Sequence, residues 1–206
     1  MEYKASDYGI SNGYIYDIED FRNHPWDLTT RDYPYLARLP EQIMLLNFNY
    51  TNTPEKYLNQ DVATIVPIHG KLDNPESIIF GYGDEMDPSF KELRDFNNGE
   101  CLKNVKSMRY LEAPNYRNVL SFIESAPFQV LIMGHSCSNS DRTLLNTIFE
   151  HPNCLSIKPY YYVTDKEKVT DNYTELVQHI SRNFNDMKLM RDRVVNKTQC
   201  QPLIHD

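Results

Sequence analysis

The chain has 206 residues, of which 40% are hydrophobic, a share typical of a globular protein rather than a disordered one. Its 29 acidic and 21 basic residues give a formal net charge of -8, which opposes diffuse attraction to nucleic acid or to anionic membrane surfaces. No apolar run approaches the roughly 18 residues of a membrane-spanning helix, and the first residues do not form a secretion signal. We therefore expect a cytoplasmic protein that binds neither membranes nor, directly, nucleic acid.

The chain divides into three segments by pattern. Residues 1–40 hold many aromatic and turn-forming residues with weak periodicity, and we expect an irregular segment there. Residues 41–185 alternate strand and helix patterns, and residues 186–206 fit a C-terminal helix or tail. The four cysteines are scattered without a C-x-x-C pair, so we expect free thiols.

After residue 40 the elements can be taken in chain order. Short apolar runs predict buried strands, and apolar positions at helical spacing predict amphipathic helices. The predicted strands are 43–48, 63–68, 77–80, 128–133 and 156–163, and the predicted helices are 115–124, 140 to just before Pro152, and 173–184. Asn115 is expected to cap the first of these helices, and residues 81–85 to form a turn with solvated carboxylates. This alternation predicts an α/β fold that is Rossmann-like, with a mostly parallel sheet and flanking helices.

Polar residues follow three of the predicted strands. Asn47 and Asn49 end the first strand, and His69 and Gly70 end the second. The third ends in the sequence Gly-His-Ser-Cys-Ser-Asn-Ser-Asp at residues 134–141, just before a helix. Because ligands of open α/β sheets bind at the carboxyl ends of strands, we expect one site there, with the loop and helix start holding phosphates.

These motifs resemble the AbiH family of bacterial abortive-infection proteins. The resemblance covers residues 43 to about 163 and rests on the order of four motifs, at residues 47–53, 68–70, 79–85 and 134–145. The family is in turn similar to the sirtuin-like group, whose Rossmann-type domain binds NAD. The AbiH resemblance implies a role in phage defence, and the sirtuin-like similarity implies NAD as substrate or ligand.

The resemblance also implies roles for individual residues. His69 and Asn49 correspond to the catalytic residues, and the NAD site is expected to include Asn47, Gly70, Gly134, His135, Ser136 and Asp141. Cleavage of the nicotinamide–ribose bond needs positioned polar groups, with His69 as base and Asn49 orienting water, and no metal. The sequence also leaves structural roles open for three of these residues: Asp141 as a partner of the helix dipole, His69 as a turn residue at the strand end, and His135 as a side chain packed over the helix start.

The chain departs from the family pattern at its start. Full-length relatives open with a glycine-rich turn after an apolar strand, whereas residues 11–17 read Ser-Asn-Gly-Tyr-Ile-Tyr-Asp with no apolar strand before them. We therefore expect a fold that is incomplete at the N-terminus. Such a sheet would be completed by a homo-oligomer or a partner chain.

Two other functions remain open at this stage. The Gly-His-Ser loop resembles the nucleophile elbow of serine hydrolases, with Ser136 as nucleophile, Asp165 as acid and His179 as base. Alternatively, the domain binds a nucleotide or a protein without turnover.

Overall fold

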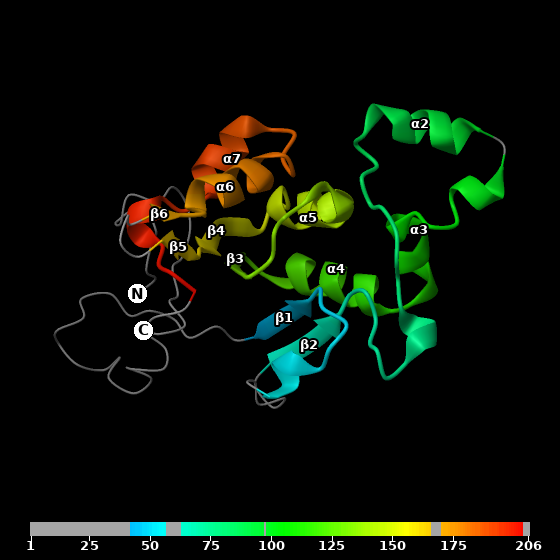
Figure 1. Cartoon of the computed structure of the whole chain (residues 1–206), viewed down its shortest axis with the longest axis horizontal. Coiled ribbons are helices and arrows are strands. Elements are labelled where there is room, and N and C mark those ends of the chain that lie inside the picture. Colours follow the sequence, from blue (N-terminus) through cyan, green and yellow to red (C-terminus); the bar gives the residue numbers. More distant parts are fainter. Residues whose placement is uncertain (1–41, 57–62, 97, 166–169, 204–206) are drawn as a thin grey trace.

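The computed structural model describes residues 42–56, 63–96, 98–165 and 170–203, so the segment 1–40 lies outside the described residues. The described chain is mixed α/β, as the sequence predicts (Figure 1). The strands are β1 (Ile43–Asn47), β2 (Ala63–Pro67), β3 (Phe128–Met133), β4 (Cys154–Tyr160), β5 (Val163–Asp165) and β6 (Thr170–Asp171). The α-helices are α2 (Pro88–Asp95), α3 (Lys106–Arg109), α4 (Asn115–Ser125), α5 (Arg142–Phe149), α6 (Tyr173–Ser181) and α7 (Met187–Arg193).

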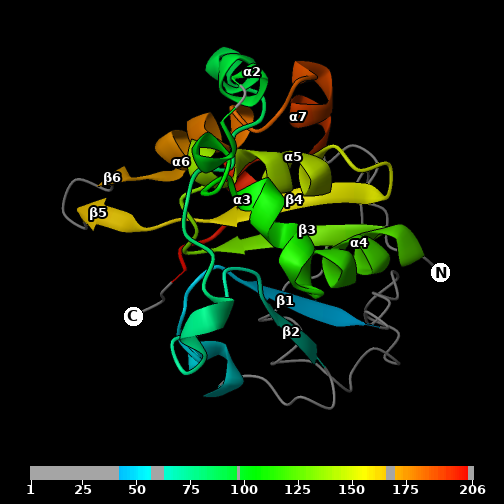
Figure 2. The same cartoon turned by 90° about the vertical axis from the view of Figure 1, so that its right-hand side faces the viewer.

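The strands pair two by two. β1 pairs with β2 in parallel, β3 pairs with β4 in parallel through the crossover helix α5, and β5 and β6 form a small antiparallel pair. Figure 2 shows β1 and β2 below β3 and β4, and within the described residues no hydrogen-bonded ladder joins the two parallel pairs. The expected parallel pairing is therefore present, but the sheets are small and partly antiparallel. The strand expected at 156–163 ends at Tyr160, where the chain turns into the β5–β6 pair.

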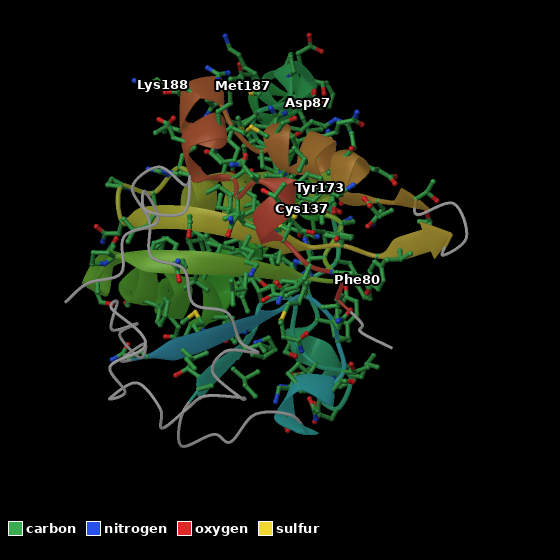
Figure 3. The ribbon with its side chains drawn as sticks, turned by 90° about the vertical axis from the view of Figure 1, so that its left-hand side faces the viewer. Phe80, Asp87, Cys137, Tyr173, Met187 and Lys188 are labelled. Atoms are coloured by element: carbon green, nitrogen blue, oxygen red, sulfur yellow. The ribbon has the colours of Figure 1, made fainter. Side chains whose placement is uncertain are left out.

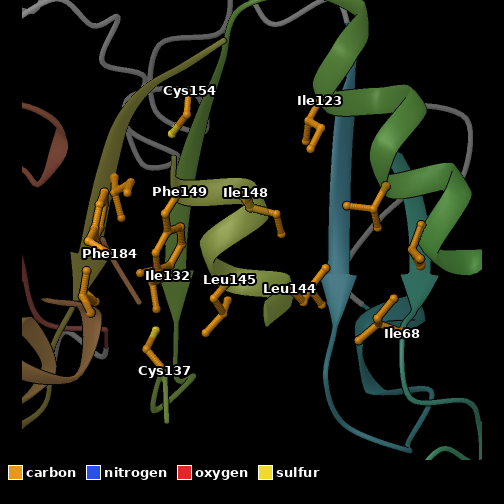
Figure 4. Packing of buried hydrophobic residues seen from close by; sticks show 14 of the residues in the cluster. Ile68, Ile123, Ile132, Cys137, Leu144, Leu145, Ile148, Phe149, Cys154 and Phe184 are labelled. Atoms are coloured by element: carbon orange, nitrogen blue, oxygen red, sulfur yellow. The ribbon is translucent and has the colours of Figure 1, made fainter. Parts of the chain in front are cut away.

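Side-chain packing rather than backbone hydrogen bonding joins the two parallel pairs. Figure 4 shows Leu144, Leu145 and Ile148 of α5 between them, next to Ile132 of β3. One hydrophobic cluster includes buried residues of α4, α5 and α6 as well as of three strands. Burial of this apolar surface is the main force that holds the carboxyl ends of β2 and β3 on the same side of the domain.

The predicted helices are present with small differences at their ends. In α4, Val119 and Ile123 are buried on the predicted face, and in α6 the buried residues are Leu176 and Ile180. The prediction for Asn115 is wrong, because Pro114 occupies the cap position and the Asn115 side chain donates to the carbonyl of Pro67, 2.8 Å away. Asn115 thus ties the start of α4 to the end of β2.

The strand expected at residues 77–80 is absent. A 3-10 helix, Pro75–Ser77, overlaps the first residue of this stretch, and Ile79 is buried while its N–H donates to the carbonyl of His69. A single apolar anchor thus produced the strand-like pattern. The chain then continues to α2, which has no buried residue and lies at the edge of the molecule, before it returns through α3 (Figure 1).

The described part of the chain contains no helix that is both long and apolar enough to span a bilayer. All four cysteines are free thiols, as expected. In Figure 3, Cys137 lies in the interior, whereas Phe80 lies at the surface with 63% of its area exposed.

Candidate functional site

The loops after β2 and β3 meet in a buried cluster of charged side chains. Nε2 of His69 lies 3.0 Å from Oδ1 of Asp141, and Nζ of Lys106 donates to the same oxygen at 2.7 Å. All three side chains are buried, with at most 7% of their area exposed. We call His69, Lys106 and Asp141 the Asp141 cluster.

The electrostatics of the cluster keep Asp141 ionised. Burial by itself would raise the pKa of this carboxyl, but its interactions with the side chains of His135, His69 and Lys106 outweigh burial and hold the pKa well below its usual range. Lys106 supplies the compensating positive charge. With Asp141 acting as acceptor, Nε2 of His69 carries a proton, and Nδ1 is the ring nitrogen left for chemistry.

Aromatic rings surround His69. The Tyr110 hydroxyl lies 3.3 Å from Nε2 of His69, and the Tyr110 and His69 rings are parallel with centroids 6.4 Å apart. Burial, and secondarily the charge of Asp141, raises the pKa of Tyr110, so its hydroxyl stays neutral. Phe48 packs edge-on against His69 at 5.5 Å, and Tyr50 lies 6.3 Å away. These rings pack around the imidazole, whose side chain is 5% exposed.

Neither Lys106 nor Tyr110 was identified from the sequence. Both lie in the long segment between β2 and α4, which has no strand-end motif at these positions. Only the close approach of this segment to the strand ends brings them to His69 and Asp141. A single sequence carries no local signal for such a contact.

The two asparagines after β1 differ in position. Asn47 is buried, its Oδ1 accepts from the Asn49 N–H at 3.0 Å, and its amide donates to the carbonyl of Thr51. It therefore shapes the loop. Asn49 is exposed, so its side chain is the one available to water or a ligand.

Gly70, which follows His69, is buried in a turn that requires glycine. Its φ is +84°, and a Cβ there would lie 2.2 Å from the carbonyl oxygen of Ser77. Gly70 thus fixes the direction in which the chain leaves the cluster. The direct contact of Gly70 with a ligand stays a prediction.

The loop at residues 134–141 is held by its own side chains. Nδ1 of His135 accepts from the Cys137 N–H at 3.0 Å, while its Nε2 lies 3.7 Å from Oδ2 of Asp141. The His135 ring also packs on Phe48 with centroids 4.0 Å apart, and its side chain is 20% exposed. His135 thus links the cluster to the surface of the loop.

The start of α5 is less open to phosphates than the sequence suggests. The N–H groups of Asp141, Arg142 and Thr143 donate to protein carbonyls, those of Ser138, Asn139 and Gly83 respectively. The Asp141 side chain makes no capping hydrogen bond, because it points to Lys106 and His69 instead. A diphosphate at this position would have to displace the Gly83 carbonyl from the N–H of Thr143.

The turn at residues 81–85 anchors the Lys106 segment to α5. The expectation of solvated carboxylates is wrong for Asp84, which is 2% exposed and pairs with Arg142 at 3.2 Å. Next to it, a Cβ at Gly83 would lie 2.8 Å from the Ser140 carbonyl oxygen. The backbone carbonyl of Tyr82 accepts a hydrogen bond from the backbone N–H of Lys106 at 2.9 Å, so the turn sets the position of the buried lysine.

A groove of about 210 Å³ lies beside the loop, between the end of β4 and α6. It is lined by Gly134, His135, Ser136, Tyr160, Tyr162, Asn172, Glu175, Leu176 and His179. His135 belongs to both the groove wall and the surroundings of Asp141, so this side chain lies between the groove and the cluster. Within the described ranges, no group of three or more His, Cys, Asp and Glu side chains is placed to hold a metal ion.

The serine-hydrolase interpretation can be compared with this geometry. His179 contacts the backbone carbonyl of Ser136 through Nδ1 at 2.9 Å, not the serine hydroxyl. Among the described residues other than glycine, the one with a positive φ, +53°, is Cys137 rather than Ser136. Burial, and secondarily Asp141, raises the pKa of the Cys137 thiol to about 12, so the thiol is not an alternative nucleophile. The geometry gives no support to a hydrolase elbow.

Comparison with known proteins identifies the family. The model of the family described as "Bacteriophage abortive infection AbiH" matches residues 19–163, more than half of the chain. The chain belongs to the AbiH family. The match begins before the motifs that suggested it and ends at β5, so the Asp141 cluster lies inside it and Glu175 and His179 of α6 lie outside. No curated protein and no solved structure matches the chain. Membership in AbiH implies a role in abortive infection, the defence of bacteria against phage.

Proposed function

We propose that this AbiH protein acts in phage defence by cleaving NAD at the nicotinamide–ribose bond. The observation that carries the proposal is the pairing of His69 with ionised Asp141 at the carboxyl ends of the strands, beside a groove. A histidine held by a buried carboxylate is the arrangement that orients a general base. The charge of Lys106 balances that of Asp141 and keeps the carboxylate from taking the proton itself.

The reaction consumes water and yields nicotinamide, ADP-ribose and a proton. As the glycosidic bond breaks, positive charge develops on the ribose, and a base that removes a proton from the attacking water or from a ribose hydroxyl assists the step. Nδ1 of His69 takes that proton in our proposal, because Nε2 is bound to Asp141. Asn49, which is exposed at the end of β1, orients the water.

The ligand site is proposed on the same side of the domain. Gly134, His135 and Ser136 line the groove and would contact the ligand directly. Asn47 and Gly70 shape the neighbouring loops, and Asp141 acts through His69. The parallel pairing of β1 with β2 and of β3 with β4 supports a sirtuin-like, Rossmann-type origin for this arrangement.

The test is incubation of the purified protein with NAD, with nicotinamide and ADP-ribose followed by chromatography. We expect release by the unmodified protein and a loss of about 100-fold or more in His69→Gln, which removes the base. His151→Gln is the matched control, because His151 lies just before β4, at the opposite end of the strand pair from the loop.

A second variant separates catalysis from folding. The Asn49 side chain is exposed, so Asn49→Ala should lower turnover without changing the melting temperature. A folded unmodified protein that releases no nicotinamide would overturn the proposal. So would a His69→Gln protein that keeps the original rate.

A further inference from the structure

The groove presents hydrogen-bond acceptors on one helix face. Glu175 and His179 lie four residues apart on α6 and therefore share a face, and both line the groove. His179 lies 2.9 Å from the Ser136 carbonyl through Nδ1, which must be the donor because a carbonyl only accepts. In the neutral ring Nε2 is then an acceptor, like the carboxylate of Glu175.

The opposite wall is aromatic and held in place. Tyr160 is buried, whereas Tyr162 is 43% exposed at the groove. Asn172 clamps the Tyr162 backbone on both sides, because its Oδ1 accepts from the Tyr162 N–H at 2.7 Å and its own N–H donates to the Tyr162 carbonyl. A Cβ at Gly134 would lie 3.2 Å from the Tyr162 hydroxyl, so the tyrosine lies over the glycine of the loop.

The groove is poorly suited to an additional phosphate. None of its lining residues in the described structure is a lysine or an arginine, and Glu175 contributes a negative charge. A vicinal diol has two O–H donors that match a carboxylate, and a planar base can stack on an exposed tyrosine. A ribonucleoside with free hydroxyls combines both features.

We propose that the groove binds the adenosine end of the dinucleotide, with Glu175 accepting from the ribose hydroxyls and Tyr162 stacking on the base. Glu175 thereby selects NAD over its 2′-phosphorylated form, because a 2′-phosphate would replace a donor with a negative charge facing the carboxylate. This assignment rests on the proposed function for the identity of the whole ligand. It adds residues of α6, outside the family match, to the site.

Calorimetric titration with ADP-ribose and with 2′-phospho-ADP-ribose tests the assignment without requiring turnover. We expect the unmodified protein to bind ADP-ribose at least about tenfold more tightly than the 2′-phosphorylated compound. Glu175→Gln should bind ADP-ribose more weakly and lose most of this preference. Because Glu175 is exposed, this variant should fold normally, and Glu124→Gln, an exposed change on α4, is the matched control.

The outcomes separate this inference from the proposed function. Selective binding that depends on Glu175, without nicotinamide release, would support the groove assignment and overturn the hydrolase. Nicotinamide release from both NAD and NADP at equal efficiency, unchanged in Glu175→Gln, would support the hydrolase and overturn the assignment. Failure of the unmodified protein to bind either compound would also overturn it.

Discussion

Replacement of Asp141 by asparagine measures the free energy stored in the Asp141 cluster. The side chain keeps its shape but loses the charge that faces Lys106 at 2.7 Å and His69 at 3.0 Å. The Lys106 ammonium, with 7% of its side chain exposed, would then be buried without a counterion. Removal of one partner from a buried ion pair costs about 3–5 kcal/mol, a large part of the roughly 5–15 kcal/mol that stabilises a typical domain.

Equilibrium unfolding in urea, followed by circular dichroism, is the assay. A surface pair provides the matched control, since Lys71 and Glu55 also lie 2.7 Å apart but each side chain is 32% exposed. Glu55→Gln should cost no more than about 1 kcal/mol, because water screens and solvates such a pair. The lysine–carboxylate distance is the same in both pairs, so the difference in cost reflects the burial of Asp141 together with its additional contact with His69.

A double-mutant cycle tests whether the loss arises from the unpaired lysine. Asp141→Asn combined with Lys106→Met should be clearly more stable than the sum of the two single changes predicts, with a coupling of about 2 kcal/mol or more. A loss below about 1 kcal/mol in Asp141→Asn, or strictly additive effects, would refute the reasoning. If Asp141→Asn does not fold, recovery of folding in the double variant supports it.

Three further predictions follow from single positions. The folded-state pKa of Asp141 lies below the unfolded value of about 3.9, so the stabilisation by its charge is present above about pH 4 and is lost as the pH falls toward the folded value. In urea titrations, the difference in unfolding free energy between the unmodified protein and Asp141→Asn should therefore shrink below about pH 4. A constant difference would contradict this prediction. Gly70→Ala should lower the free energy of unfolding by about 2 kcal/mol or more, because φ is +84° and the new Cβ would meet the Ser77 carbonyl. Gly99→Ala is the control: no atom lies within 4 Å of its new Cβ, so the free energy of unfolding should change by at most about 0.5 kcal/mol. Cys137, whose thiol has a pKa raised to about 12 by burial, should resist iodoacetamide at pH 8 in the folded protein and react after unfolding; mass spectrometry that finds it labelled at once would count against its burial.

Local patterns were sufficient for most elements. Short apolar runs located β1, β2 and β3 within one residue, and helical periodicity identified the buried faces of α4 and α6. The apolar pattern gave a wrong prediction at residues 77–80. Ile79 is buried there, but the stretch pairs with no other strand in the described structure. Periodicity reports which side chains are buried but not which backbone pairs with which.

The sequence by itself determined that polar residues stand at the ends of β1, β2 and β3, because strand and turn preferences act over a few neighbouring residues. It did not determine their partners. Lys106 and Asp141 are 35 residues apart, and His69 and Tyr110 are 41 apart, so only the packed tertiary structure brings them into contact. The role of Asp141 is a further example. Its place at the start of a helix is compatible with an interaction with the helix dipole, but in the folded structure its carboxylate pairs with Lys106 and His69. Desolvation gives these contacts their strength, and desolvation exists only once the core has formed around them.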